Sequence, residues 1–472
     1  KTRADASTRM SADQISDVAL SIEYVLLVSK KYLREEKFMD KMADVLGRAG
    51  AWCGQNKYLS AIKNAFQNFM PLTIAGAIGV LWCNVLVNDQ TGLGLFFKPI
   101  MALDFLNPAF QAVNFCTISC ITVGITLGIA QEIGVWNMGA ERAGYIPGLV
   151  GLAAWLSVTN TSHMVDGAKE AFTGIAGNEL GATGLFTGMI IGVLSVELFC
   201  FFEKQDALKI KMPEQVPPGV ARAFEVLVPA TITLIITACI GSACYNLTGL
   251  YLNDVIKNGI QGPLGAVGAT IPGVMIIYLV IMLFWLVGIH GNNMLSAVKE
   301  ALFTPLALEN VEAFNKGETP KNIINMYALQ MWGEFGGSGV TIGLVIAIMI
   351  FGKREDNKAI ATLSLVPGLF NINETVTFGI PMVLNPILGI PFVVAPLVTI
   401  IIGYVLTVIG FCPVACLTVP WTTPPIVFGF LACGANVMGA VTQAILIVVS
   451  TVIYVPFLIS YEKYQNKQAA EA

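Results

Sequence analysis

Apolar segments of membrane-spanning length follow one another along most of the chain. A helix needs about 20 apolar residues to cross a bilayer, and ten segments approach or exceed that length. The third and eighth are shorter, and the last is interrupted by Gly434 and Asn436. The pattern predicts an all-α polytopic membrane protein with about ten transmembrane helices plus re-entrant hairpins. The segments lie at 70–87, 111–131, 145–158, 182–202, 224–250, 267–289, 338–352, 378–388, 391–411 and 426–459.

The composition agrees with many membrane spans rather than one anchor. Of the 472 residues, 55% are hydrophobic and only 12% are charged, whereas about a quarter of a soluble domain is charged. Many of the 46 glycines and 22 prolines lie inside apolar segments. Broken helices are tolerated in a membrane only where they are buried in protein or line a wet cavity. A transporter or channel is therefore indicated, and the net charge of −4 gives no sign of a nucleic-acid partner.

Charged residues predict the orientation and mark a distinct N-terminal segment. Residues 1–55 are rich in charge and hold apolar residues at three- and four-residue steps, which predicts an amphipathic helix; part of this segment could also be appended or processed sequence. Cationic clusters at 204–211, at 353–354 and at 463–467 are expected on the cytoplasmic side. An even number of spans then places both termini in the cytoplasm.

Glu374 is an isolated carboxylate beside the longest apolar stretch. No Asp, Glu, Lys or Arg occurs from Thr375 to Tyr461, and the preceding charge is Lys358. A charge at membrane depth costs about 2.5–3.5 kcal/mol on insertion scales unless it has partners or faces water. With Asn371 and Asn373 beside it, Glu374 is expected to hold something polar. The alternative is a carboxylate at the membrane surface that caps a helix.

Two further residues stand out against apolar surroundings. His290 lies between Gly288 and Gly291 in a region with no charged residue from 258 to 298; the alternative role is a histidine at the interface, bonded to backbone. Trp421 lies in the rigid turn Pro420-Trp-Thr-Thr-Pro. An indole face can pack on the C–H face of a sugar ring, although a tryptophan of the interfacial belt is the alternative.

Other chemistry is not indicated. The Gly-rich segment 332–339 lacks the Gly-Lys-Ser/Thr of a phosphate-binding loop, so we expect flexible or tightly packed backbone there. Zinc-protease, nucleophile-elbow and dinucleotide motifs are missing. The ten cysteines suggest no disulfide framework. Cys412 and Cys416 could form a metal or redox pair, but packing is favoured because no His or carboxylate lies nearby. We expect neither a metal nor a cofactor.

The segment Gly368-Leu-Phe-Asn-Ile-Asn-Glu-Thr-Val-Thr-Phe-Gly-Ile-Pro-Met-Val-Leu-Asn-Pro386 resembles a signature of one transporter family. It is similar to the sugar-translocating IIC component of the phosphoenolpyruvate-dependent phosphotransferase system (PTS), within the lactose/cellobiose/diacetylchitobiose family. Segments 61–77, 211–224, 284–291 and 420–424 agree, so the resemblance covers about residues 55–465. Thr375, where the family usually has Pro, and the Asn292-Asn293 pair depart from the pattern.

The resemblance implies a fold and a transport mode. An N-terminal membrane half (56–235) would form the scaffold of a homodimer, and a C-terminal half (236–465) would carry the sugar by an elevator movement, followed by a cytoplasmic tail (466–472). The chain would be the permease subunit of a protein-phosphocysteine–sugar phosphotransferase, in the bacterial cytoplasmic membrane. No IIB-like domain follows Tyr461, so phosphorylated IIB and the upstream IIA are expected as separate chains. No phosphorylated residue of its own is expected.

The resemblance also implies roles for individual residues. Glu374 and His290 would flank the 6-hydroxyl that receives phosphate, with Glu374 as a base or only as an anchor. Asn371 and Asn373 would bind other hydroxyls or hold a hairpin, and Trp421 would stack on a ring. Asn178 matches more loosely as a substrate-binding residue. The sugar is left open among cellobiose, lactose and diacetylchitobiose, with a preference for cellobiose or a related β-glucoside. The alternatives are an ion-coupled secondary transporter and an intramembrane transferase of another class.

Overall fold

The computed structural model describes residues 44–471, apart from 90–92, 164–171 and 214. The chain separates into two units, Lys1–Trp52 and Cys53–Ala472. In the first unit the described residues, 44–52, are helical. The amphipathic helix predicted for the N-terminal segment therefore lies mostly outside the described residues. All further description concerns the second unit.

The first part of this unit is a group of helices around a core built mainly from residues 61–256, which Leu308, Cys416 and Leu417 complete. Asn56 caps the first helix, because its side chain accepts hydrogen bonds from the backbone N–H groups of Tyr58 and Leu59. Two short strands, β1 (Ser162–His163) and β2 (Phe172–Thr173), pair in antiparallel fashion. The helices are α2 (Lys57–Leu81), α3 (Asn107–Asn114), α4 (Ile121–Met138), α5 (Ala140–Ala143), α6 (Ile146–Val158), α7 (Gly177–Leu180), α8 (Ala182–Glu203) and α9 (Pro218–Thr248), with 3-10 helices η2 (Leu93–Leu95), η3 (Lys98–Leu106) and η5 (Asp206–Leu208) and π-helices η1 (Trp82–Leu86) and η4 (Phe115–Ser119).

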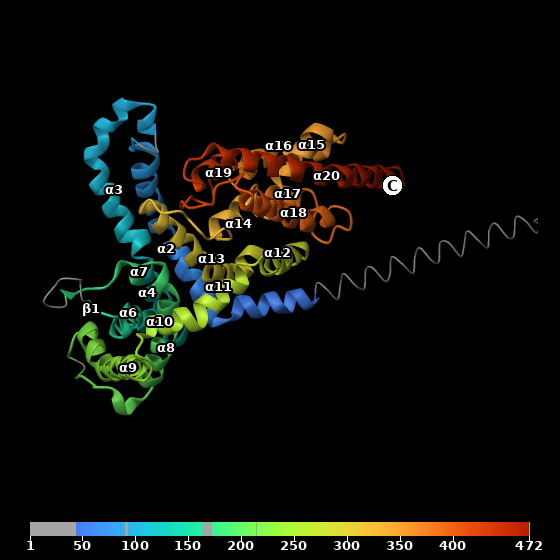
Figure 1. Ribbon diagram of the computed structural model, residues 1–472. Coiled ribbons are helices and arrows are strands. Elements are labelled where there is room, and N and C mark those ends of the chain that lie inside the picture. The colour runs from blue at the N-terminus through green and yellow to red at the C-terminus, as the bar shows by residue number, and fades with distance from the viewer. Residues whose placement is uncertain (1–43, 90–92, 164–171, 214, 472) are drawn as a thin grey trace, which may run out of the picture. The chain divides into compact units, whose positions relative to one another are not determined.

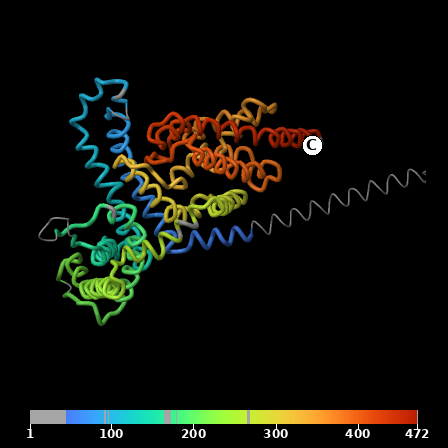
Figure 2. Tube along the Cα trace, viewed as in Figure 1, coloured from blue at the N-terminus to red at the C-terminus, as the bar shows by residue number. Residues whose placement is uncertain are grey.

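The second part surrounds its own core, built from residues 274–461. Helices α14–α20 gather there, while α13 contacts α2 and α8 of the first part as well as α14 (Figures 1 and 2). The elements are α10 (Leu252–Ile256), π-helix η6 (Lys257–Gln261), α11 (Gly262–Gly268), α12 (Ile271–Leu286), α13 (Gly291–Asn315), α14 (Met326–Gly333), α15 (Ile342–Phe351), α16 (Glu355–Leu369), α17 (Glu374–Gly379), α18 (Gly389–Val408), α19 (Val427–Ala432) and α20 (Val437–Glu471).

The all-helical membrane architecture predicted from the apolar segments is confirmed. Within the described residues, five helices are long and apolar enough to cross a membrane. A sixth span results if the bent pair Lys98–Ser119 and Ile121–Met138, which meet at 42°, is counted as one. Three shorter apolar helices, α6, α12 and α15, match predicted segments. The total of about ten spans remains a prediction.

Besides the bent segment 111–131, two predicted segments fold differently from one continuous helix. The segment 378–388 is wrong as a span, because helix α17 ends at Gly379 and residues 380–388 form turns. Pro381 and Pro386 lack the N–H groups that a helix interior needs, which explains the break. The long segment 426–459 divides at 433–436 into α19 and α20, as its internal Gly434 and Asn436 suggested.

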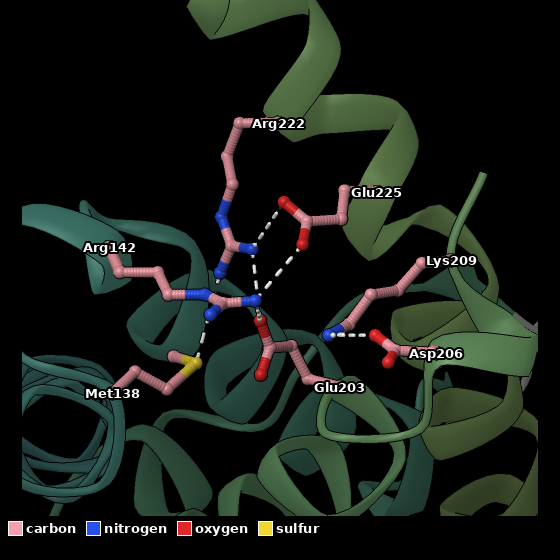
Figure 3. A network of polar contacts seen from close by, with 7 residues as sticks. All are labelled: Met138, Arg142, Glu203, Asp206, Lys209, Arg222 and Glu225. Carbon is pink, nitrogen blue, oxygen red and sulfur yellow. Dashed lines mark hydrogen bonds and ion pairs between the residues drawn. The ribbon is translucent and has the colours of Figure 1, made fainter. Parts of the chain in front are cut away.

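A buried carboxylate ties together three elements of the first part (Figure 3). Glu203, at the end of α8, is 3% exposed, forms an ion pair with Arg142 at 2.8 Å and accepts a hydrogen bond from Arg222 at 3.0 Å. Both guanidinium groups also reach Glu225 on α9, at 3.0 Å. Met138 lies next to the same cluster. The loop between α8 and α9 is therefore fixed at both ends by shared ion pairs.

We expect Glu203→Gln to destabilise the protein by about 3 kcal/mol, the lower end of the cost of breaking a buried ion pair, since Arg142 reaches water. The measurement is the fraction of protein that stays monodisperse in detergent after heating. Asp206→Asn is the control, because Asp206 pairs with Lys209 through an exposed side chain. Equal heat resistance of the Glu203 variant and the wild type would contradict a structural role for this cluster.

Candidate functional site

A cavity of about 520 Å³ opens in the second part of the chain. It is formed where four irregular or newly starting segments meet: the start of α13, the Gly-rich turn after α14, the turn between α16 and α17, and the turn before α19. Most polar side chains singled out from the sequence lie on it. The lining residues are His290, Asn292, Asn293, Ser296, Lys299, Glu300, Met326, Gln330, Glu334, Phe335, Gly337, Ser338, Asn371, Ile372, Asn373, Glu374, Trp421, Phe428 and Gln443.

His290 is held by the helix that it starts. It is the N-cap of α13, and its Nδ1 accepts a hydrogen bond of 3.3 Å from the backbone N–H of Asn293. Because Nδ1 is an acceptor, a neutral ring carries its proton on Nε2. The ring of Trp285 lies 4.5 Å from the imidazole and is tilted by 47°. The backbone-bonded alternative for His290 is therefore observed, and the residue also lines the cavity, while its site role stays a prediction.

The free nitrogen of His290 faces Glu374. The Nε2 atom lies 3.9 Å from Glu374 Oε1, and the carboxylate side chain is 47% exposed. This distance is too long for a direct hydrogen bond. Glu374 is also the first residue of α17, so the helix-terminus position considered from sequence is present. The pair offers one donor and one acceptor toward a hydroxyl group in the cavity.

The two asparagines before Glu374 brace turns. Asn373 is 3% exposed, and its amide donates to the carbonyl oxygen of Ser338 at 2.8 Å. A Cβ atom on Gly337, whose φ is +88°, would lie 2.7 Å from Asn373 Cβ, so the Gly-rich turn packs directly on this asparagine. Asn371 bonds to the same turn through Gly336. The hairpin-holding alternative for both residues is therefore observed, while their contact with a sugar stays a prediction.

Trp421 lies at the cavity, and its side chain is 43% exposed. Its turn contains no helix between 409 and 426. Trp421 therefore has exposed surface at the cavity that Asn371 and Glu374 also line. Asn178 belongs to α7, but its side chain lies outside the described residues. Its neighbours Gly177 and Gly181 line a second cavity, of about 430 Å³, beside the end of α13.

An ion pair in the cavity wall was missed from the sequence. Lys299 on α13 pairs with Glu334 after α14, and their side chains are 7% and 16% exposed. The hydroxyl of Tyr278 donates to Glu334 at 2.7 Å, and Asn292 Oδ1 lies 3.5 Å from the Lys299 ammonium. Glu334 belongs to the Gly-rich segment interpreted as packed backbone. The signal was available, because Glu334 is another carboxylate next to an apolar helix.

The cavity also holds polar groups with unused bonding capacity. Within the described residues, the Gln330 Oε1 atom is buried without a partner. Ser338 accepts from Asn292 at 2.9 Å and sits beside Asn373. Such amides and hydroxyls match the hydroxyl groups of a sugar. The described part of the chain places no three His, Cys, Asp or Glu side chains together to hold a metal ion.

Comparison with known proteins shows one family over most of the chain. The model of the family "Phosphotransferase system, EIIC" matches residues 63–396. An oligo-beta-mannoside-specific EIIC component of Bacillus subtilis is 33% identical over 433 residues, covering 91% of this chain and 94% of that protein. A cellobiose-specific EIIC component of Lactococcus lactis is 30% identical, with 90% and 98% coverage.

The structural comparison agrees. The crystal structure of the transporter ChbC, the IIC component from the N,N'-diacetylchitobiose-specific phosphotransferase system, matches with a TM-score of 0.81. The two chains are 30% identical, and the match covers 89% of this chain and 97% of that one. A lactose-specific EIICB component of Streptococcus mutans is 32% identical, and this chain covers 71% of its length. The resemblance identified from sequence motifs is confirmed.

We expect Lys299→Met or Glu334→Gln alone to lower stability by about 3–5 kcal/mol, because each leaves a buried charge without its partner. The double variant is expected to regain much of that loss, since no uncompensated charge remains. Thermal unfolding of the three purified variants in detergent checks this. Losses that simply add in the double variant would show that the two side chains do not act as a pair.

Proposed function

The chain belongs to the EIIC family of the phosphotransferase system, and on that premise we propose that it imports a β-linked disaccharide whose 6-hydroxyl is phosphorylated by a phosphorylated IIB protein. The observation that carries this proposal is the pair His290 and Glu374, which face each other across 3.9 Å at a cavity. A volume of about 520 Å³ lies within the range of small-molecule sites.

The proposed chemistry uses the two side chains on one hydroxyl group. The sugar O6–H donates to the Glu374 carboxylate, while the Nε2–H of His290 donates to O6 and orients it. As the P–S bond of the IIB phosphocysteine breaks and the O6–P bond forms, the hydroxyl proton passes to Glu374. Phosphoryl transfer depends mainly on positioning and electrostatics, so this chain needs no phosphorylated residue of its own.

The remaining wall would recognise the rest of the sugar. Trp421 presents an indole surface on which a pyranose ring can stack, and its 43% exposure leaves room for that contact. Asn373, Gln330 and Ser338 supply amide and hydroxyl groups around it. Among the sugars named for the relatives, cellobiose or a related β-glucoside is our first choice.

Family membership also supports proposals on assembly and movement. IIB, supplied from IIA, would dock from the cytoplasm, either as a separate chain or in a fused form as in the lactose-specific EIICB relatives. The halves 56–235 and 236–465 would act as dimer scaffold and moving transport domain in an elevator mechanism. Most residues of the two hydrophobic cores fall on either side of that division, although Leu308, Cys416 and Leu417 of the second half pack into the first core. The protein would lie in the bacterial cytoplasmic membrane with both termini in the cytoplasm.

The test of the proposed function is uptake of a panel of β-disaccharides into vesicles that carry this chain, with and without IIB, IIA and phosphoenolpyruvate. We expect internal sugar phosphate, formed only with the complete system and most rapidly with cellobiose. Free sugar inside, driven by a proton or sodium gradient, would instead indicate the ion-coupled transporter. Equal uptake of non-β-linked disaccharides would contradict the proposed substrate class.

Glu374→Gln is expected to lower the rate of sugar phosphorylation by about 10²–10⁴-fold, the usual contribution of a general base. Sugar affinity should change little, because the amide keeps one oxygen as an acceptor. The measurement pairs phosphoryl transfer from phospho-IIB with calorimetric binding of cellobiose. Glu355→Gln, on an exposed first turn of α16, is the matched control. A phosphorylation rate equal to that of the wild type would contradict a role of Glu374 as the base.

A further inference from the structure

Asn371, which lines the cavity, has an unusual backbone conformation. Its φ angle is +62°, in the left-handed region that Asn and Gly tolerate best. The residue follows the end of α16, and its backbone N–H bonds to the carbonyl of Gly368 at 3.0 Å. Glu374 begins α17 three residues later. The backbone conformation alone therefore favours Asn or Gly at this position.

The side chain of Asn371 connects three cavity-lining turns. Its Oδ1 accepts from the backbone N–H of Gly336 at 2.7 Å. Its Nδ2 donates to the backbone carbonyls of Trp421, at 2.5 Å, and Thr423, at 3.2 Å. These partners also fix the orientation of the amide, because two carbonyls need donors and one N–H needs an acceptor.

This bonding leaves the amide little capacity for a ligand. An asparagine side chain has two N–H donors and one carbonyl oxygen, and both donors of Asn371 are committed to carbonyls. The other side-chain hydrogen bonds to this segment lie toward its ends: Gln443 accepts from Ile426 N–H at 2.7 Å, and the hydroxyl groups of Tyr327 and Thr418 are 2.7 Å apart. Asn371 thus braces the middle of the segment, at Trp421 and Thr423.

We propose that Asn371 is a positioning residue, which sets the indole of Trp421 at a fixed place relative to Glu374 and does not itself bind the sugar. The expected effect of Asn371 on sugar affinity rests on the proposed function. The bracing of the Trp421 turn does not, because the three hydrogen bonds join turns of the protein without any ligand. Loss of the two donated bonds frees the Trp421 turn while leaving Gln443 and Tyr327 in place.

Two substitutions separate the amide from the backbone. Asn371→Asp keeps the size, the acceptor and the tolerance for positive φ, but replaces two donors with an oxygen that repels the Trp421 and Thr423 carbonyls. Asn371→Gly keeps the backbone conformation and removes the whole side chain. Asn385→Ala is the matched control, because that amide also makes three hydrogen bonds, to Pro381, Ile387 and Leu388, at a turn that does not line the cavity.

The first measurement needs no sugar. Hydrogen–deuterium exchange of the purified full-length chain is followed on peptides that cover residues 417–427. Both Asn371 variants should exchange faster there, by about tenfold for a lost brace of ordinary strength, and the control should not. Unchanged exchange in both variants would overturn the proposal, whether or not the protein transports a disaccharide.

The second measurement is a double-mutant cycle with cellobiose as the calorimetric probe. Trp421→Ala and Asn371→Asp should each weaken binding by about tenfold, but Asn371→Asp should add less than about twofold in the Trp421→Ala background, because coupled residues are not additive. Additive losses would show that Asn371 contacts the sugar itself and would overturn the proposal. Absence of binding to the wild type contradicts cellobiose as the substrate, and the exchange experiment then decides on Asn371 alone.

Discussion

The backbone N–H and C=O groups of this protein need hydrogen-bond partners within the protein. At the cavity the backbone is not helical, and side chains supply the partners that a helix would otherwise provide. In the hydrocarbon region an unpaired N–H or C=O group costs several kcal/mol. The irregular segment 409–426 nevertheless borders the cavity. Its carbonyls and N–H groups are met by amides from distant helices, as Asn310 and Asn325 show by donating to Ala415 O at 3.0 and 3.1 Å. Buried asparagine and glutamine side chains therefore hold the backbone around the site in place, in addition to lining its surface.

The charges in the cavity are handled in two different ways. Lys299 and Glu334 are paired, desolvated and joined by Tyr278, so their geometry is fixed by the protein. Glu374 is half exposed, and His290 stops 3.9 Å short of it. A fully paired charge has little left to offer a ligand, whereas a carboxylate with one open face can accept a proton or a hydrogen bond. In the proposed function, the chemical task would fall on Glu374, the charge that the fold leaves incompletely satisfied.

The contrast explains what could be predicted from the sequence. Helices α8 and α9 followed directly from apolar length, and Glu374 and His290 followed from isolation amid apolar residues. Helix α13 did not, because Lys299, Glu300 and other charges along it break the apolar pattern that marks a span. Its burial between two groups of helices is a tertiary effect. The pairing of Lys299 with Glu334 joins residues 35 positions apart, and no local spacing encodes it.

One further consequence comes from His290, which both faces the site and caps α13. The 25-residue helix is about 37 Å long at 1.5 Å per residue, and its last residue, Asn315, accepts a hydrogen bond of 3.1 Å from Asn84 in the first part of the chain. Helix α13 therefore links the cavity, at its first turn, to the first part of the chain. In a straight helix of this length a tilt of roughly 10° about one end displaces the other by roughly 6 Å, and Pro305 inside α13 is a point where the helix can bend. A displacement between the two parts of the chain would therefore reach His290 through this helix.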